Sequence, residues 1–242
     1  MRVEAGFFSL TAAEDDDDYL RWHLLDHMPE QFRIPGIQHG LRYIADERTV
    51  AARVAGDGPL ADIGGVANYL MGAPVQATYD AFVALGRELA DAGRYPRVKP
   101  SLGLQMRALL CTEAAPRVLV SPEVVPWRPH RGVVLVIEAP VVDDAQAWLE
   151  WLGWLGAHHH PAVLDVAGVA GIWQYGSTTA WRTAPRHAAP GWTTVIYVDD
   201  DPSTVAGELA TLLEERWADG TVRPLFAGPM RSMVTWEVWP SP

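Results

Sequence analysis

The sequence predicts an α+β protein in which two βαββαβ units close against each other into one pseudo-twofold α/β barrel. Apolar runs of strand length alternate with helical patterns in this order twice along the 242 residues. In addition, one set of residues recurs at a constant spacing of 132 positions. Each unit would carry both helices on one face of its sheet, so two units can cover each other's open faces. The predicted units are residues 1–114 and 132–242, joined by a proline-rich linker at 115–131.

The recurring residues are densest around the first helix of each unit. The motif W-x-x-x-x-H-x-P begins at Trp22 and again at Trp154. Several pairs coincide there without a gap, which indicates a tandem duplication. These pairs are Trp22 and Trp154, His27 and His159, Pro29 and Pro161, Ile34 and Val166, Gly36 and Gly168, Ile37 and Val169, and Tyr43 and Tyr175. At a slightly shorter spacing, Pro100 and the Met106-Arg107 pair match Pro224 and the Met230-Arg231 pair.

In the first unit, acidic residues at 15–18 precede the first helix and suit the positive end of its dipole. A second helix is predicted from about residue 75 to 92, ended by Gly93. A long connection at 47–65 is expected to be a loop. The predicted strands of this unit are residues 7–11, 36–45, 65–72 and 101–110.

The second unit repeats the pattern. Its first helix follows Asp143 and Asp144, and its second helix is predicted over 203–218, with Ser203 as the N-cap and Gly220 after its end. A connection rich in glycine and proline occupies 176–191. The predicted strands are residues 133–139, 169–175, 193–200 and 231–239.

Composition and charge exclude several classes of function. The formal net charge of -11 opposes binding to a phosphate backbone, so nucleic acid is not an expected partner. No apolar run approaches the roughly 20 residues that cross a bilayer, and the acidic N-terminal region does not resemble a secretory signal. A cytoplasmic protein without membrane contact is therefore expected. Cys111 is the single cysteine, which rules out an intrachain disulfide and a thiolate metal cluster.

The first helix and the strand after it carry a resemblance to a known family. Trp22, His27, Pro29 and Glu30, followed by Pro35-Gly36 and Arg42-Tyr43, resemble the dimeric α/β-barrel superfamily of ferredoxin-like units, and within it the EthD-like proteins. The resemblance covers both halves and is closest over residues 19–45. It implies that small hydrophobic ligands bind between helix and sheet. Its members include cyclases, isomerases, lyases and monooxygenases that work without a metal or nucleotide.

The second copy departs from the pattern of that family. Ala162, Ala167 and Gln174 stand where the first copy has Glu30, Pro35 and Arg42. Two equivalent active sites are therefore not expected.

His27 is the predicted catalytic residue, with His159 as its counterpart in the second unit. The ordinary pKa of histidine lies near neutrality, so His27 could remove a proton from an acidic carbon or a phenol. Arg107 and Tyr43 would stabilise the oxyanion that develops. An alternative is open at both positions, because a histidine near a helix C-terminus can cap backbone carbonyls instead.

A wider set of residues is predicted to bind the substrate. Aromatic rings would hold a flat molecule and exclude water, while histidine, tyrosine and arginine side chains would contact its oxygen atoms. The predicted binding residues are Trp22, His23, His39, Tyr69, Trp154, Tyr175 and Arg231.

No metal site is predicted. The run His158-His159-His160 could suggest one, but consecutive helix residues point about 100° apart and do not converge on one ion. A stronger site would add His130 or His187 from another segment. No cofactor is predicted either, although a heme or a reduced flavin is left open. The acidic clusters are expected to be helix caps.

The sequence thus predicts a cofactor-independent enzyme that acts on a hydrophobic aromatic or polyketide-like molecule through histidine acid/base chemistry. The alternative is a non-catalytic small-molecule-binding or assembly module, in which His27 is bonded to backbone beside a filled core. The expected partner is a hydrophobic small molecule, and the protein is expected to be a monomer or a homodimer.

Overall fold

The computed structural model describes residues 2–12, 17–56, 58–95, 101–178, 180–181 and 191–234. These residues form an antiparallel sheet with helices on its outside, so the predicted α+β class is confirmed. The strands are β1 (Val3–Ala12), β2 (Ile37–Ile44), β3 (Ala55–Gly56), β4 (Ile63–Gly72), β5 (Ser101–Ala114), β6 (Gly132–Pro140), β7 (Val169–Gly176), β8 (Trp192–Val198) and β9 (Val222–Ser232). The α-helices are α1 (Asp17–Trp22), α2 (Met28–Gln31), α3 (Glu47–Ala51), α4 (Val75–Asp91), α5 (Ala145–Trp154), α6 (His160–Asp165) and α7 (Pro202–Trp217).

The two halves of the sheet have the same internal strand order. The order along the whole sheet is β2-β4-β1-β5-β7-β8-β6-β9-β3, so β5 of the first half pairs with β7 of the second. At the other end, β2 pairs with β9 through Tyr43 with Ser232 and Ile44 with Arg231. The two halves are therefore joined by backbone hydrogen bonds at two places.

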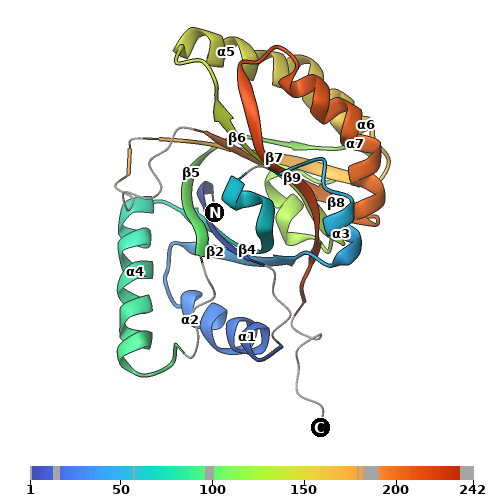
Figure 1. Cartoon of the computed structure of the whole chain (residues 1–242). Helices are drawn as coiled ribbons and strands as arrows, with labels where there is room; N and C mark the ends of the chain where they lie inside the picture. The colour runs from blue at the N-terminus through green and yellow to red at the C-terminus, as the bar shows by residue number, and fades with distance from the viewer. Residues whose placement is uncertain are drawn as a thin grey trace.

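The helices of each half cover the outer face of their own part of the sheet (Figure 1). Side chains that alternate along a strand point to opposite faces, so Phe7 packs against the helices while Phe8 packs in the core shared by both halves. That shared core contains large aromatic residues such as Trp173 and Tyr197. Among the described residues, none of the helices has both the length and the apolar character to cross a bilayer.

The first long helix of each half is interrupted by a π-helical turn, at His23–His27 and at Leu155–His159. The N–H that closes each turn donates to the carbonyl five residues earlier. Pro29 and Pro161 follow at the same position in each half, and proline has no N–H to continue the α-helical ladder. The wider turn changes the helical phase. His23 is also buried, on the face that it shares with Leu20, Leu24 and His27 at the ordinary helical spacing of three and four residues.

Several predicted boundaries are wrong. The connection at 47–65 contains helix α3, which begins with a capping box between Asp46 and Thr49. The N-cap of α7 is Asp201 and not Ser203, because the Asp201 carboxylate accepts from the Thr204 N–H. The last strand ends at Ser232, so the prediction over 231–239 was shifted towards the C-terminus; residues 235–239 lie outside the described part.

The predicted linker at 115–131 is packed against the sheet. It contains 3-10 turns at Pro116–Val118 and Pro122–Trp127. Val125 is fully buried in the shared core, and the Pro122 carbonyl accepts a hydrogen bond from the Trp173 indole. The division of the chain into domains stays a prediction.

Gly171 is required where β7 meets β5. A Cβ atom at this position would lie 2.5 Å from the backbone oxygen of Glu113, which cannot move without breaking the ladder. We expect Gly171→Ala to lower the free energy of unfolding by about 1–3 kcal/mol in urea denaturation. Gly153→Ala is the control, because nothing lies within 4 Å of that Cβ position in helix α5. It should leave stability unchanged or raise it by up to about 1 kcal/mol. Equal effects of the two substitutions would contradict this account.

Candidate functional site

The N-terminal half encloses a cavity of about 200 Å³ between its helices and the outer face of its sheet, which we call the His27 cavity. Its floor comes from alternate residues of β1 and from β4, and its walls come from the first helix and from α4. The lining residues are Phe7, Ser9, Thr11, Tyr19, Trp22, His23, His27, Ala67, Tyr69, Phe82, Tyr95, Ser101 and Leu104. Aromatic rings dominate this lining. The cavity therefore brings together Trp22, His23, His27 and Tyr69 of the predicted site residues.

His27 is held between two aromatic rings. Its imidazole stacks on Trp22, with ring centres 4.8 Å apart and planes at 27°, and the edge of Tyr95 meets it at 5.1 Å. Burial lowers the pKa of His27 from its ordinary value of 6.5 to about 4; Asp26 raises it and Arg94 lowers it to smaller extents. The imidazole is therefore neutral at pH 7 and can accept a proton.

The hydrogen bonding of His27 differs from the capping alternative. Its Nε2 lies 3.2 Å from the side-chain amide of Gln31, one turn further along the helix. Its Nδ1 is buried and has no hydrogen-bond partner within the described residues. Since neither ring nitrogen bonds to a backbone carbonyl of the described residues, His27 does not cap the helix.

Two further polar groups around the cavity also have no hydrogen-bond partner within the described residues. These are Nδ1 of His23 and the hydroxyl of Tyr69, both buried. The His23 and His27 rings are 5.6 Å apart. Burial, and to a smaller extent Arg42 and His27, hold the pKa of His23 well below its ordinary value, so this ring is also neutral. Burial raises the pKa of Tyr69, which keeps its hydroxyl protonated as a potential donor.

Arg42 and Tyr95 belong to the surroundings of the cavity but were not predicted as site residues. Arg42 is buried on β2, and its guanidinium lies 5.6 Å from the centre of the Tyr19 ring. Its positive charge lowers the pKa of both His23 and Tyr69. Arg42 could have been identified from the sequence, because the family motif contains the Arg42-Tyr43 pair. Tyr95 follows the second helix without any motif that could have identified it.

A charged network fixes the helix that carries His27. Arg94, just after α4, contacts Asp26 and Glu30, each at 2.9 Å. The backbone carbonyl of Arg94 also accepts a hydrogen bond from the Trp22 indole at 2.9 Å. Hydrogen bonds from Arg33 and Arg94 lower the pKa of Glu30 and keep it ionised. Asp26 therefore orients the helix and not the His27 ring.

Tyr43 and His39 lie outside the His27 cavity. They line a wider hollow of about 680 Å³ beside the free edge of β2, which we call the Tyr43 groove. The Tyr43 hydroxyl and Nε2 of His130 are 3.0 Å apart, and His39 stacks on Trp127 with ring centres 5.5 Å apart. Tyr43 is thus engaged with His130 and not with His27.

Arg107, Tyr175 and Arg231 are also separate from the His27 cavity. Arg107 is buried, donates to the Ser177 hydroxyl, and has its pKa lowered by burial to about 10. Tyr175 lies in the core shared by both halves. Arg231 lies 4.0 Å from Asp46 near the junction of β2 and β9. The predicted oxyanion role of Arg107 and Tyr43 towards His27 is therefore not supported by their positions.

The second copy of the motif has a different environment. Nε2 of His159 donates to the Leu212 carbonyl of α7 at 3.2 Å, so His159 binds a carbonyl of another helix and does not cap its own. His159 lines none of the four cavities that stand out in the described part of the chain. Trp154 is 37% exposed. Between β6 and α7, the second half holds a buried Glu138–Arg216 ion pair with two contacts of 2.6 and 2.7 Å.

The three consecutive histidines diverge, as the helical geometry predicts. His158 is exposed, His159 binds the Leu212 carbonyl, and His160 binds Glu113. His130, considered as an additional ligand, is engaged with Tyr43. His187 lies outside the described residues.

No protein-family model and no curated protein sequence matches the chain. Solved structures do match over almost its whole length. An anthrone oxidase-like protein has a TM-score of 0.56 at 13% identity, covering 97% of this chain and 92% of that one. An arginine-to-glutamate variant of the chlorite dismutase from Candidatus Nitrospira defluvii has a TM-score of 0.56 at 15% identity, covering 98% and 95%. A provisionally named monooxygenase from Fusobacterium nucleatum has a TM-score of 0.52 at 8% identity, covering 96% and 94%.

The prediction that the protein works without a cofactor is contradicted by the chlorite dismutases among these structures, which are heme-binding proteins. The helix–sheet spaces of this chain do not fit a heme as they stand. The His27 cavity, at about 200 Å³, is smaller than the roughly 300–1,000 Å³ of pockets for drug-sized ligands. In the second half, His159 and His160 are bonded to Leu212 and Glu113. No step of the chemistry below passes through a heme.

At these low identities the similarities establish the fold alone. They do not single out the EthD-like proteins, so that part of the resemblance stays a prediction. The chain has the ferredoxin-like α/β fold that chlorite dismutase-like and monooxygenase-like proteins of the dimeric α/β-barrel superfamily share.

Proposed function

We propose that the protein is an enzyme that binds a small aromatic or polyketide-like molecule in the His27 cavity and removes a proton from it. The observation that carries this proposal is the set of three buried polar atoms around an aromatic cavity, on His23, His27 and Tyr69, that lack a hydrogen-bond partner within the described residues. Buried polar groups are nearly always satisfied in folded proteins. A ligand with oxygen atoms would satisfy these three.

In this proposal His27 is the general base. Its low pKa keeps the imidazole unprotonated at neutral pH. The Gln31 amide nitrogen lies 3.2 Å from Nε2. The proposal requires a 180° turn of this amide, so that its oxygen accepts a hydrogen bond from Nε2. Nε2 then carries the hydrogen, and Nδ1 is free to accept a proton from an acidic carbon or a phenol.

The developing oxyanion would be stabilised by groups other than those predicted from the sequence. The Tyr69 hydroxyl stays protonated and can donate to it. Arg42 supplies a buried positive charge near both His23 and Tyr69. The rings of Trp22 and Tyr95 would hold the flat substrate on either side of His27 and keep water away.

The size of the cavity limits the substrate. A volume of about 200 Å³ suits a compound of one or two rings, and a larger compound would have to extend out of the opening. The anthrone oxidase-like protein of the same fold is named after a tricyclic aromatic ketone, which supports the substrate class. The alternative of a non-catalytic module is less well supported, because His27 is bonded to a side chain beside an open volume.

We also propose that the two halves arose by tandem duplication and close into a pseudo-twofold barrel. The equal strand orders, the π-helical turns at equivalent positions and the pairing of β2 with β9 support this. The proposed duplicated chain contains both halves, so a monomer is sufficient, and a homodimer is compatible with it.

The position of the ligand can be tested by filling the cavity. Ala67 lines it, and leucine at this position would occupy part of the open volume. With 1-naphthol as the probe, we expect Ala67→Leu to raise the Kd at least about tenfold in isothermal titration calorimetry, which corresponds to 1.4 kcal/mol. An unchanged Kd for 1-naphthol would show that the ligand binds outside the His27 cavity. The Tyr43 groove would then be the next site to fill by substitution.

A matched substitution separates cavity filling from general damage. Ala206 lies on α7, is fully buried in the core of the second half, and lines none of the four cavities considered above. Ala206→Leu should therefore destabilise the protein by about 1–3 kcal/mol through overpacking. Ala67→Leu should be tolerated, because the cavity accepts the extra atoms.

A further inference from the structure

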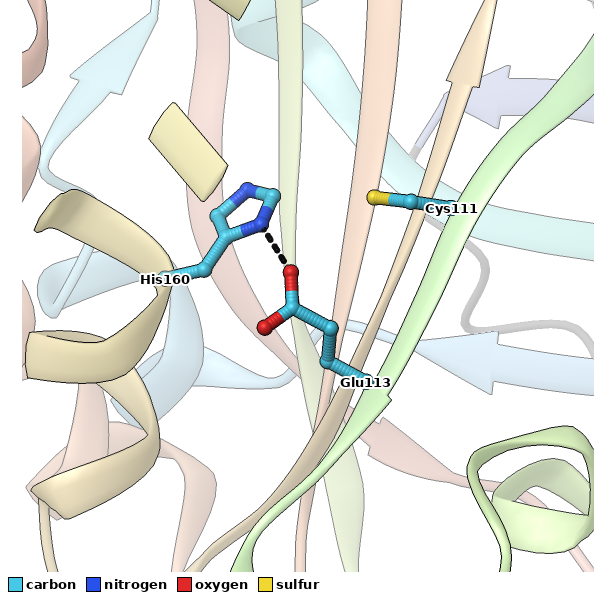
Figure 2. A group of neighbouring side chains, drawn as sticks. All are labelled: Cys111, Glu113 and His160. Atoms are coloured by element: carbon cyan, nitrogen blue, oxygen red, sulfur yellow. Dashed lines mark hydrogen bonds and ion pairs between the residues drawn. The ribbon is translucent and has the colours of Figure 1, made fainter. Parts of the chain in front are cut away.

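A second cluster of reactive side chains lies where β5 of the first half meets α6 of the second half, away from the His27 cavity. Cys111 and Glu113 are two residues apart on β5 and therefore point to the same face of the sheet. His160, the first residue of α6, lies over them. Figure 2 shows the thiol, the carboxylate and the imidazole directed towards one another. The Cys111 sulfur, a carboxylate oxygen of Glu113 and a ring nitrogen of His160 all lie within 4.8 Å of one another.

We propose that Cys111, Glu113 and His160 form a binding site for a single zinc ion. A thiolate sulfur, a carboxylate oxygen and an imidazole nitrogen are the three ligand types that zinc prefers in proteins. The two segments that supply them, β5 and α6, belong to the folded framework and bring the ligands together without a mobile loop. This proposal is independent of the chemistry assigned to His27.

The site needs a small rearrangement to accept the ion. Nδ1 of His160 and Oε1 of Glu113 are 2.6 Å apart and share a hydrogen. Zinc bonds of about 2.0–2.1 Å in tetrahedral geometry would separate these two atoms to roughly 3.3 Å, with the metal replacing the shared hydrogen. The thiol must also lose its proton. Burial and Glu113 raise the pKa of Cys111 to about 11, so the free thiol is protonated at neutral pH and zinc would displace that proton.

Gln174 supplies a second observation that points to a ligand. This residue is 2% exposed, and its Oε1 lies 3.7 Å from the Cys111 sulfur. Its amide nitrogen is buried without a hydrogen-bond partner in the described part of the chain. After a 180° turn of the amide, this nitrogen can donate to the thiolate that zinc binding would create. A water molecule can complete a four-coordinate site. The Glu113 side chain, which is 30% exposed, gives the ion a route from solvent.

A structural reading of the same contacts is that His160 and Glu113 form a hydrogen bond and that the thiol donates weakly to Gln174. Nε2 of His160 stays buried without a partner among the described residues in both readings, because zinc would bind Nδ1. The hydrogen-bond reading gives no role to the meeting of all three groups at one point. The two readings differ in what happens when a divalent ion is added.

Cobalt(II) is the probe that distinguishes them, because it replaces zinc and absorbs light. A thiolate bound to cobalt gives a charge-transfer band in the near ultraviolet, and Cys111 is the single cysteine of the chain. The band therefore reports this site alone, whatever the other histidines bind. We expect titration of the full-length protein to give this band at one equivalent of cobalt, together with the strong visible bands of four-coordinate cobalt. Zinc should then abolish both.

Variants identify the ligands. Cys111→Ser should remove the charge-transfer band, while Glu113→Gln and His160→Asn should each raise the Kd for zinc by more than about tenfold, since even indirect partners of metal ligands cost 10–100-fold. The control is His158→Asn, an exposed neighbour on the same segment, which should leave the Kd unchanged. Circular dichroism checks that each variant is folded. Absence of the band in the folded wild-type protein, or a Kd that is equal in wild type and Cys111→Ser, would overturn the proposal.

Discussion

Replacement of His27 by glutamine is expected to lower kcat/KM for an aromatic substrate by about 10²–10⁴-fold, the usual contribution of a general base. Glutamine keeps a polar side chain of similar length but cannot accept a proton. Glutamine also loses the ring contacts that His27 makes with Trp22 and Tyr95. Part of the decrease in kcat/KM will therefore come from weaker substrate binding. Steady-state kinetics on planar phenols and aromatic ketones measure the change.

The pH profile separates a base from a residue that only positions the substrate. Burial lowers the pKa of His27 to about 4, so the free enzyme should keep its base unprotonated down to that pH. We expect kcat/KM to be flat from neutrality to about pH 5 and to fall below it. An acidic limb near 6.5, the ordinary pKa of histidine, would contradict the assignment. Circular dichroism at each pH confirms that the protein is still folded.

His159→Gln is the matched control for this prediction. It changes the equivalent position of the repeated motif, where the imidazole donates to the Leu212 carbonyl. We expect this substitution to affect stability and to leave kcat/KM nearly unchanged. Equal losses of activity in both variants would show that the motif acts through the fold of the two halves and not through a base at His27.

Replacement of Glu138 by alanine is expected to lower the free energy of unfolding by about 3–5 kcal/mol. Glu138 and Arg216 are both fully buried, and their side chains contact each other at 2.6 and 2.7 Å. The carboxylate also accepts a hydrogen bond from the Trp217 indole at 2.7 Å. Removal of Glu138 leaves the guanidinium charge in the interior with the Thr194 hydroxyl as a neutral partner at 2.9 Å.

Two controls test this explanation in chemical denaturation. Arg48→Ala breaks an exposed ion pair with Asp201 and should cost no more than about 1 kcal/mol. Changing Glu138→Leu and Arg216→Met together removes both charges while keeping most of the volume. Because the cost arises from an uncompensated charge, the double variant should be clearly more stable than Glu138→Ala. A double variant as unstable as the single one would assign the effect to packing.

The sequence predicted the part of the site that depends on a local motif. Trp22 and His27 are five residues apart on one helix, and the helix position alone places them against the sheet. Tyr69 followed from its place on a predicted strand. Arg42 and Tyr95 were missed, because their proximity to His27 is set by how β2 and the end of α4 pack against that helix. The spacing of residues along the chain does not reveal contacts of this kind between separate segments.

The roles of the two histidines could not be separated from the sequence. His27 and His159 stand in the same motif and the same π-helical turn, yet one lines a cavity and the other binds a carbonyl. The difference lies in their surroundings, since Trp22 and Tyr95 contact the His27 ring while His159 reaches the Leu212 carbonyl of α7.

Strand β5 carries a constraint on how far the two halves can diverge. Ala108 pairs with Ala5 of its own half and with Gly176 of the other, so this residue contacts strands of both halves. A larger side chain at this half-buried position would have to fit against both neighbours. In proteins descended from the same ancestor, we expect these three positions to stay small or to change together, while the helices that cover each half evolve separately.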